Sequence, residues 1–191
     1  MVRATVDDLC TSVDLLNHSE EVSRILNEAS SEAAGWLEAI AKVFRADDGV
    51  VLLAAVGGGL TVLQNFEQDL LDTPVRVQPM LVGGSAALTT KVQNDMTTDE
   101  FADRIFVRAG IVAVLATTCS GRTKLVDSIL RRAKEDCIPA FIVHGETPKY
   151  VEETSLMLAT RRSDVFEDCL SQIMHVLVSR LQREYRAEIS A

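Results

Sequence analysis

The sequence predicts an α/β protein with a doubly wound, mainly five-stranded parallel sheet, helices on both faces and an N-terminal helical extension. Continuous apolar runs of strand length, such as Val-Val-Leu-Leu-Ala-Ala-Val at 50–56, are typical of strands buried on both faces. These runs alternate with segments whose apolar residues recur at helical spacing, as expected of a doubly wound sheet. The 191 residues, 47% hydrophobic and only 5% aromatic, suffice for one domain with an aliphatic core.

The first segment is predicted to be helical, because its apolar residues recur at helical spacing over 6–45. Asn-His-Ser at 17–19 predicts a break, and Ser19 followed by Glu20 and Glu21 is typical of a helix N-cap with an acidic first turn. We therefore expect one short helix and one long helix. The apolar stripe near the N-terminus indicates packing against another copy of the chain.

The remaining elements follow in alternation. Strands are expected at 50–56, 75–82, 111–116, 140–144 and 156–159. Helices are expected at 60–71, 85–94, 98–108 and 123–136, with a final helix over 163–187. Since no linker, repeat or low-complexity tract divides the chain, we expect one domain, with 1–48 as its helices for oligomerisation and 49–191 as its ligand-binding α/β part.

The composition argues against direct binding to nucleic acid or to a membrane surface. Lys and Arg number 19 against 28 Asp and Glu, a net charge of −9, and short basic clusters are interrupted by apolar or acidic neighbours. The four cysteines are widely spaced and only three histidines are present, so no zinc-cluster spacing appears and a reducing compartment is favoured. No signal peptide or membrane-spanning run is apparent, and we expect a cytoplasmic protein.

Two strand-to-helix loops are suited to binding an anion. Gly57, Gly58 and Gly59 follow the first strand and open a helix, where glycine lets backbone N–H groups approach an anion. A tight turn alone is the alternative. Neither a GxGxxG pattern nor a P-loop lysine is present, which disfavours a dinucleotide or ATP site.

The second loop follows the third strand and is rich in hydroxyl groups. Thr118, Ser120 and Thr123 supply hydroxyls, and Gly121 frees the backbone, so the loop and the helix start predict a cradle for a phosphate monoester. Helix capping by Ser120 or Thr123 is the alternative and uses the same N–H groups. Cys119, at a helix N-terminus, is a candidate for a lowered pKa.

The second loop, in the run 112–123 followed by Ala-Lys-Glu at 133–135, resembles the phosphosugar-binding signature of SIS (sugar isomerase) domains. More narrowly, 50–184 resembles the phosphoheptose (sedoheptulose-7-phosphate) isomerase branch. The matching segments occur in the same order: the triple glycine, Asn-Phe-Glu-Gln-Asp-Leu at 65–70, Leu-Thr at 88–89 with Asn-Asp at 94–95, the second loop, and Asp164, Glu167 and His175. The N-terminal helices also suit the tetramers of that family.

The resemblance implies a function and a set of site residues. It implies aldose–ketose isomerisation of a sugar phosphate in a site between subunits, with Asp69 and His175 as the acid/base pair. It implies a phosphosugar site of Gly57, Gly58, Gly59, Asn94, Asp95, Thr118, Cys119, Ser120, Gly121, Thr123 and Asp164. Some family members hold zinc, and the corresponding residues here are Asn65, Asp69, Glu167 and His175.

The chain departs from the family pattern at several of these positions. Gly59 has no hydroxyl where the family has serine, and Asn65 replaces a histidine ligand. Asp69 replaces glutamate, which withdraws a base by about 1.5 Å, and a misplacement of this order costs ~10²-fold in rate. Glu167 and His175 are separated by about 12 Å along one helix, so a single ion bridging them requires two subunits.

Two functions therefore stay open. The first is an active sugar-phosphate isomerase. The second is a phosphosugar-binding regulator or oligomeric interaction module that has lost catalysis, like the branch that associates with the bacterial replication initiator. Each residue also has a structural alternative: His175 lies in an apolar helical stretch as a core or interface residue would, and Asp164 suits the first turn of a helix.

Overall fold

The computed structural model describes residues 6–46, 48–73, 75–82, 96–147 and 154–189. Its elements are α1 (Val6–Ala46), β1 (Gly49–Ala54), α2 (Gly58–Leu71), β2 (Val77–Val82), α4 (Thr98–Ala109), β3 (Ile111–Thr118), α5 (Lys124–Glu135), β4 (Ala140–His144), β5 (Ser155–Met157) and α6 (Ser163–Ile189). The five expected strands are all present, with ends that differ from the expected ones by a few residues. The helix expected at 85–94 lies outside the described residues.

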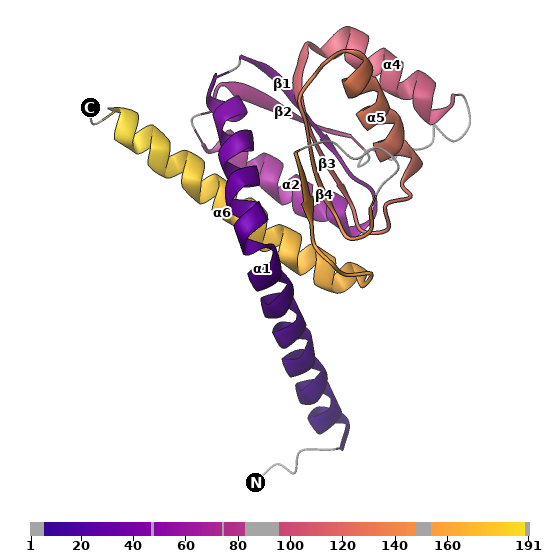
Figure 1. Ribbon diagram of the computed structural model, residues 1–191, viewed down its shortest axis with the longest axis vertical. Helices are drawn as coiled ribbons and strands as arrows, with labels where there is room; N and C mark the ends of the chain where they lie inside the picture. The colour runs from indigo at the N-terminus through magenta and orange to yellow at the C-terminus, as the bar shows by residue number, and fades with distance from the viewer. Residues whose placement is uncertain (1–5, 47, 74, 83–95, 148–153, 190–191) are drawn as a thin grey trace.

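The strands form one parallel sheet in the order β2-β1-β3-β4-β5, with helices on both faces (Figure 1). Successive residues alternate between the faces, because side chains of a strand point to opposite sides. Leu53 and Leu115, paired in register, pack with α1, α2 and α6, whereas their neighbours Leu52 and Val114 pack with α4 and α5. The predicted doubly wound α/β fold is confirmed.

The strand order reverses between β1 and β3, which pair directly although β2 lies between them in the chain. At such a switch point the connections after the two strands leave toward opposite faces, which opens a crevice at the carboxyl edge of the sheet. Here those connections are the glycine-rich loop before α2 and the hydroxyl-rich loop before α5. The fold therefore brings the two predicted anion-binding loops to neighbouring positions.

The predicted break at 17–19 is wrong, because α1 is one continuous helix from Val6 to Ala46. The His18 side chain contacts the start of α6, with its Nε2 atom 2.7 Å from Asp168 Oδ2. This contact with α6 helps to hold residues 17–19 in the helical conformation. Asn and Ser lower intrinsic helix propensity by only a fraction of a kcal/mol, about 0.5 per residue, so tertiary contacts override them.

The two halves of α1 have different surroundings. Ile25, Trp36 and Phe44 are buried in the core against the sheet and α6, whereas Leu15 and Leu16 are 65% and 64% exposed. Figure 1 shows the N-terminal half projecting beyond the rest of the chain. Among the described residues, no helix combines the length and apolar character needed to cross a membrane.

Candidate functional site at the switch point

The glycine-rich loop positions the start of α2 at the carboxyl edge of the sheet. Gly57 is the N-cap residue and has φ of 64°, a left-handed conformation that favours glycine. Among the side chains that the structure describes, none caps α2, and its first turn contains no acidic residue. The backbone N–H groups at this helix start are thus uncapped by side chains, as an anion-binding helix start requires.

The last two residues of β3, Thr117 and Thr118, lie beside different loops. Thr118 points toward α5, where its Oγ1 atom lies 3.0 Å from Thr123 Oγ1. Thr117 points toward α2, where a β-carbon at Gly59 would lie 2.8 Å from Thr117 Oγ1. The strand alternation therefore gives each helix start one threonine hydroxyl.

Hydrogen bonds within the hydroxyl-rich loop hold its shape. The Gly121 N–H donates to Thr118 Oγ1 at 3.2 Å, and the Arg122 N–H donates to Ser120 Oγ at 3.3 Å. Thr123 is the N-cap residue of α5, but its side chain does not cap that helix. The predicted alternative of capping by Thr123 is therefore wrong, and its hydroxyl is shared with Thr118 instead.

Glu167 reaches the glycine-rich loop from α6. A β-carbon at Gly58 would lie 1.8 Å from Glu167 Oε1, so the carboxylate packs directly over this glycine. A carboxylate at a helix N-terminus interacts favourably with the helix dipole. Glu167, which is predicted as a metal ligand, contributes negative charge to the edge where the two loops meet.

Cys119 lies near Glu167 and two further carboxylates. Burial raises the pKa of the Cys119 thiol above its ordinary value, and the nearby charges of Glu167, Glu146 and Asp164 raise it further. The expectation of a lowered pKa is wrong, because desolvation and negative charge both oppose the thiolate. The surroundings of Cys119 therefore favour the neutral thiol over the thiolate.

Asp164 belongs to a group of ion pairs between α1 and the start of α6, which we call the α1–α6 cluster: His18, Glu21, Arg162, Asp164 and Asp168. Arg162 Nη2 lies 2.7 Å from Asp164 Oδ2, and Arg162 Nη1 lies 2.7 Å from Glu21 Oε2. The hydrogen bond from Arg162 lowers the pKa of Asp164 to about 2. Asp164 is thus engaged with a cation of its own chain.

The other predicted catalytic and metal residues are Asn65, Asp69 and His175. Asn65 and His175 are exposed, and Asp69 is half-buried, on α2 and α6. Within the described part of the chain, no group of three or more His, Cys, Asp or Glu side chains is placed to hold a metal ion. Within one chain, Asp69, Glu167 and His175 are therefore not placed together as the ligands of one metal ion.

Two further predicted residues, Asn94 and Asp95, lie outside the described residues.

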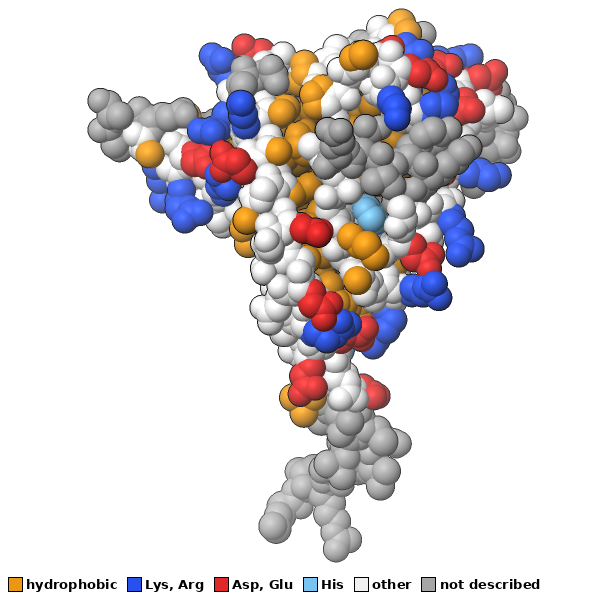
Figure 2. Space-filling view, in the orientation of Figure 1, with side chains coloured by type: hydrophobic (Ala, Val, Ile, Leu, Met, Phe, Trp, Pro, Cys, Tyr) orange, Lys and Arg blue, Asp and Glu red, His pale blue; other side chains and the backbone are white. Residues whose placement is uncertain are grey.

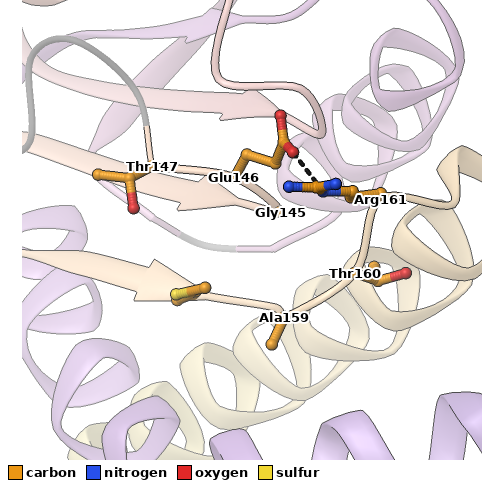
Figure 3. Close-up of a pocket in the computed structure, with 7 residues that line it drawn as sticks. Gly145, Glu146, Thr147, Ala159, Thr160 and Arg161 are labelled. Atoms are coloured by element: carbon orange, nitrogen blue, oxygen red, sulfur yellow. Dashed lines mark ion pairs between the residues drawn. The ribbon is translucent and has the colours of Figure 1, made fainter.

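A cavity of about 400 Å³ adjoins the hydroxyl-rich loop, and sequence reasoning missed it. It is lined by Gly145, Glu146, Thr147, Met157, Ala159, Thr160 and Arg161 (Figure 3). Glu146 Oε1 pairs with Arg161 Nε at 2.6 Å across it. The loop after β4 also supports the hydroxyl-rich loop, since the Glu146 N–H donates to Cys119 O at 2.8 Å. A glycine directly after a buried strand was the available signal.

The structure is similar to solved structures of proteins with sugar isomerase domains. A phosphoheptose isomerase from Neisseria gonorrhoeae matches with a TM-score of 0.74 at 16% identity, over 90% of this chain and 99% of its own. The NanR protein of Vibrio vulnificus, solved in complex with ManNAc-6P, matches with a TM-score of 0.64 at 16% identity, over 96% and 70%. The sugar isomerase domain of an RpiR transcription factor from Sphaerobacter thermophilus matches with a TM-score of 0.60 at 20% identity, over 89% of each chain.

No protein-family model and no curated protein sequence matches the chain. The structural matches cover 89–96% of this chain. The chain therefore has the fold of phosphoheptose isomerases and of other sugar isomerase (SIS) domain proteins.

Proposed function

We propose that this chain binds a sugar phosphate at the carboxyl edge of β1 and β3. The observation that carries the proposal is the meeting of two helix starts without side-chain caps at one switch point, each with a threonine hydroxyl beside it. Backbone N–H groups and hydroxyls at a helix N-terminus are well suited to a phosphate. The structures matched above include one in complex with ManNAc-6P, which supports the same class of ligand.

The charge distribution explains why helix starts would hold the phosphate. Figure 2 shows Lys and Arg side chains interspersed with Asp and Glu on the visible face. Around the hydroxyl-rich loop, Glu146 already pairs with Arg161 and with Arg122. A phosphate would therefore depend on the amides and hydroxyls of the hydroxyl-rich loop more than on free cations.

As the finer proposal, the chain isomerises its ligand, in the manner of a sedoheptulose-7-phosphate isomerase, in a site between subunits of a tetramer. Moving a proton between adjacent carbons needs a base and a group that polarises the carbonyl, and Asp69 and His175 are the proposed pair. His175 is on the exposed side of α6, so a neighbouring subunit could reach it. A bound divalent metal would polarise the carbonyl. Its proposed ligands, Asn65, Asp69, Glu167 and His175, would have to come from two subunits.

A second proposal, a non-catalytic phosphosugar-binding regulator or interaction module, is favoured by Asp69, which is shorter than the glutamate of the family pattern. The glycine at position 59 and the asparagine at position 65 favour it as well. Both proposals share the same ligand class and differ in turnover. In either role we place the protein in the cytoplasm, where Cys119, Cys137 and Cys169 would stay as the free thiols that the structure describes.

A turnover assay with a binding control separates these functions. The purified protein is incubated with sedoheptulose 7-phosphate, with and without a divalent metal, and the aldoheptose 7-phosphate product is measured. Product formation that depends on His175, tested with His175→Ala, supports the isomerase. No product under any metal, together with a raised melting temperature in sedoheptulose 7-phosphate, supports the binding module. No product and no stabilisation would contradict both.

A further inference from the structure

Thr117 has a buried hydroxyl that the fold itself leaves unused. The residue is 2% exposed, and among the described residues its Oγ1 atom has no hydrogen-bond partner. Buried hydroxyls are normally bonded, so an unpartnered one requires an explanation. A valine would fill the same space at the end of a buried strand without a polar atom.

The position of this hydroxyl is tied to the glycine at position 59. A β-carbon there would lie 2.8 Å from Thr117 Oγ1, closer than a β-carbon approaches a neighbouring atom in real structures. A serine at position 59 and a threonine at position 117 therefore exclude each other without a shift. The two residues form a matched pair: Thr117 on β3 carries the hydroxyl, and Gly59 on α2 has no side chain and leaves space for it.

We infer that Thr117 supplies the hydroxyl that the glycine-rich loop lacks, and that the Gly59/Thr117 pair sets how this chain contacts the sugar part of its ligand. The inference rests on the proposed binding of a sugar phosphate. It concerns one further residue, which contacts an oxygen of the sugar at the start of α2. Together with the N–H groups of Gly58 and Gly59, the hydroxyl gives this helix start three donors for that oxygen.

The adjacent residues Thr117 and Thr118 are expected to contact different parts of the ligand. Thr118 is bonded into the hydroxyl-rich loop through Thr123 and Gly121, where the phosphate is proposed to bind. Thr117 faces the opposite side, toward α2. In a ligand that spans both loops, the phosphate thus lies beside Thr118 and an oxygen of the sugar contacts Thr117. Glu167, whose carboxylate lies over Gly58, is the flexible side chain that would move aside.

The test uses Thr117→Val, which keeps the shape and removes the hydroxyl. Titration calorimetry of sedoheptulose 7-phosphate should show about tenfold weaker binding than for the wild type, as expected for one lost hydrogen bond. Inorganic phosphate, which occupies only the other loop, should bind equally well to both. The melting temperature of the ligand-free variant should rise, because a buried polar atom without a partner has been removed. Thr61→Val, at an exposed threonine of α2, is the matched control and should change none of these values.

A swap variant tests the pairing directly. Gly59→Ser combined with Thr117→Ala returns the hydroxyl to the helix and makes room for it, so this double variant should regain most of the sugar-phosphate affinity that Thr117→Ala alone loses. A structural role for the hydroxyl predicts a lower melting temperature for Thr117→Val and unchanged affinity, which would overturn the inference. If the wild type does not bind sedoheptulose 7-phosphate at all, the proposed function fails and the inference fails with it. If the wild type binds and Thr117→Val binds as tightly, only the inference fails.

Discussion

Single side chains at the carboxyl edge of the sheet decide what this site can hold. Gly58 has no side chain, which leaves space for the carboxylate of Glu167 directly above it. Gly121, with φ of 64°, has the backbone oxygen of Glu146 only 2.7 Å from where a β-carbon would lie. The backbone contact and the positive φ thus require glycine at position 121, whereas the contact at Gly58 is with a flexible side chain.

Glu167→Gln should tighten the binding of sedoheptulose 7-phosphate by roughly tenfold, because it removes a negative charge beside the site while keeping the side-chain shape. Calorimetric titration at low ionic strength would measure the change. Asp168→Asn, one residue along α6 and in the α1–α6 cluster, serves as the control for charge removal elsewhere. Weaker binding in Glu167→Gln than in the control would instead indicate that the carboxylate holds the ligand.

His144 should make stability depend on pH. The side chain is only 3% exposed, and burial lowers its pKa below the ordinary 6.5, although a hydrogen bond with the Glu146 backbone opposes the shift. Below pH 6.5 the unfolded chain therefore binds a proton that the folded chain does not, so stability falls as the pH decreases through this range.

His144→Gln should reduce this dependence, seen as a smaller loss of melting temperature between about pH 7.5 and about pH 5.5. The carboxylates common to both proteins contribute equally to the two profiles. Identical losses in wild type and variant would show that His144 does not cause the effect.

At the level of elements, most of the architecture could be predicted because it depends on local pattern. Continuous apolar runs identified β1, β3 and β4, which are largely buried on both faces of the sheet. The α1 break was predicted wrongly because the polar residues at 17–19 are held in a helix by partners on α6, which no local pattern reveals. The contact of Glu167 with Gly58 was missed for the same reason. The third strand was expected to end at residue 116, which placed Thr117 in the loop without a role, whereas β3 continues to Thr118 and its alternation directs Thr117 and Thr118 to opposite faces.

Ser19→Ala tests the corrected view of α1. Because Ser19 is inside a continuous helix and not at its N-cap, the substitution should change the free energy of unfolding by less than about 0.5 kcal/mol. Loss of a true N-cap would reduce it by about 1 kcal/mol. Urea unfolding followed by circular dichroism distinguishes the two values. A loss near the larger value would restore the predicted break.

At the scale of the whole molecule, the fold leaves apolar surface on the part of α1 that projects from the domain. Leu15 and Leu16 are both mostly exposed there. This arrangement agrees with the proposal that the N-terminal segment joins copies of the chain. The proposed site between subunits depends on that assembly.

Leu15→Ser combined with Leu16→Ser should shift the protein from an oligomer toward the 20.9 kDa chain in light scattering. The wild type at the same concentration is the reference. Val107→Ser, a single change at an exposed apolar residue of α4, should leave the mass unchanged. A wild type that is already monomeric would remove the inter-subunit site.

We expect a sugar phosphate to bind where the loops after β1 and β3 meet. The most direct test is to titrate isotopically labelled protein with sedoheptulose 7-phosphate and follow its backbone amide resonances. The amide resonances of Gly58, Gly59 and Gly121 should shift together in one saturable transition. Shifts confined to the Gly145 cavity, or no shifts at saturating ligand, would contradict it.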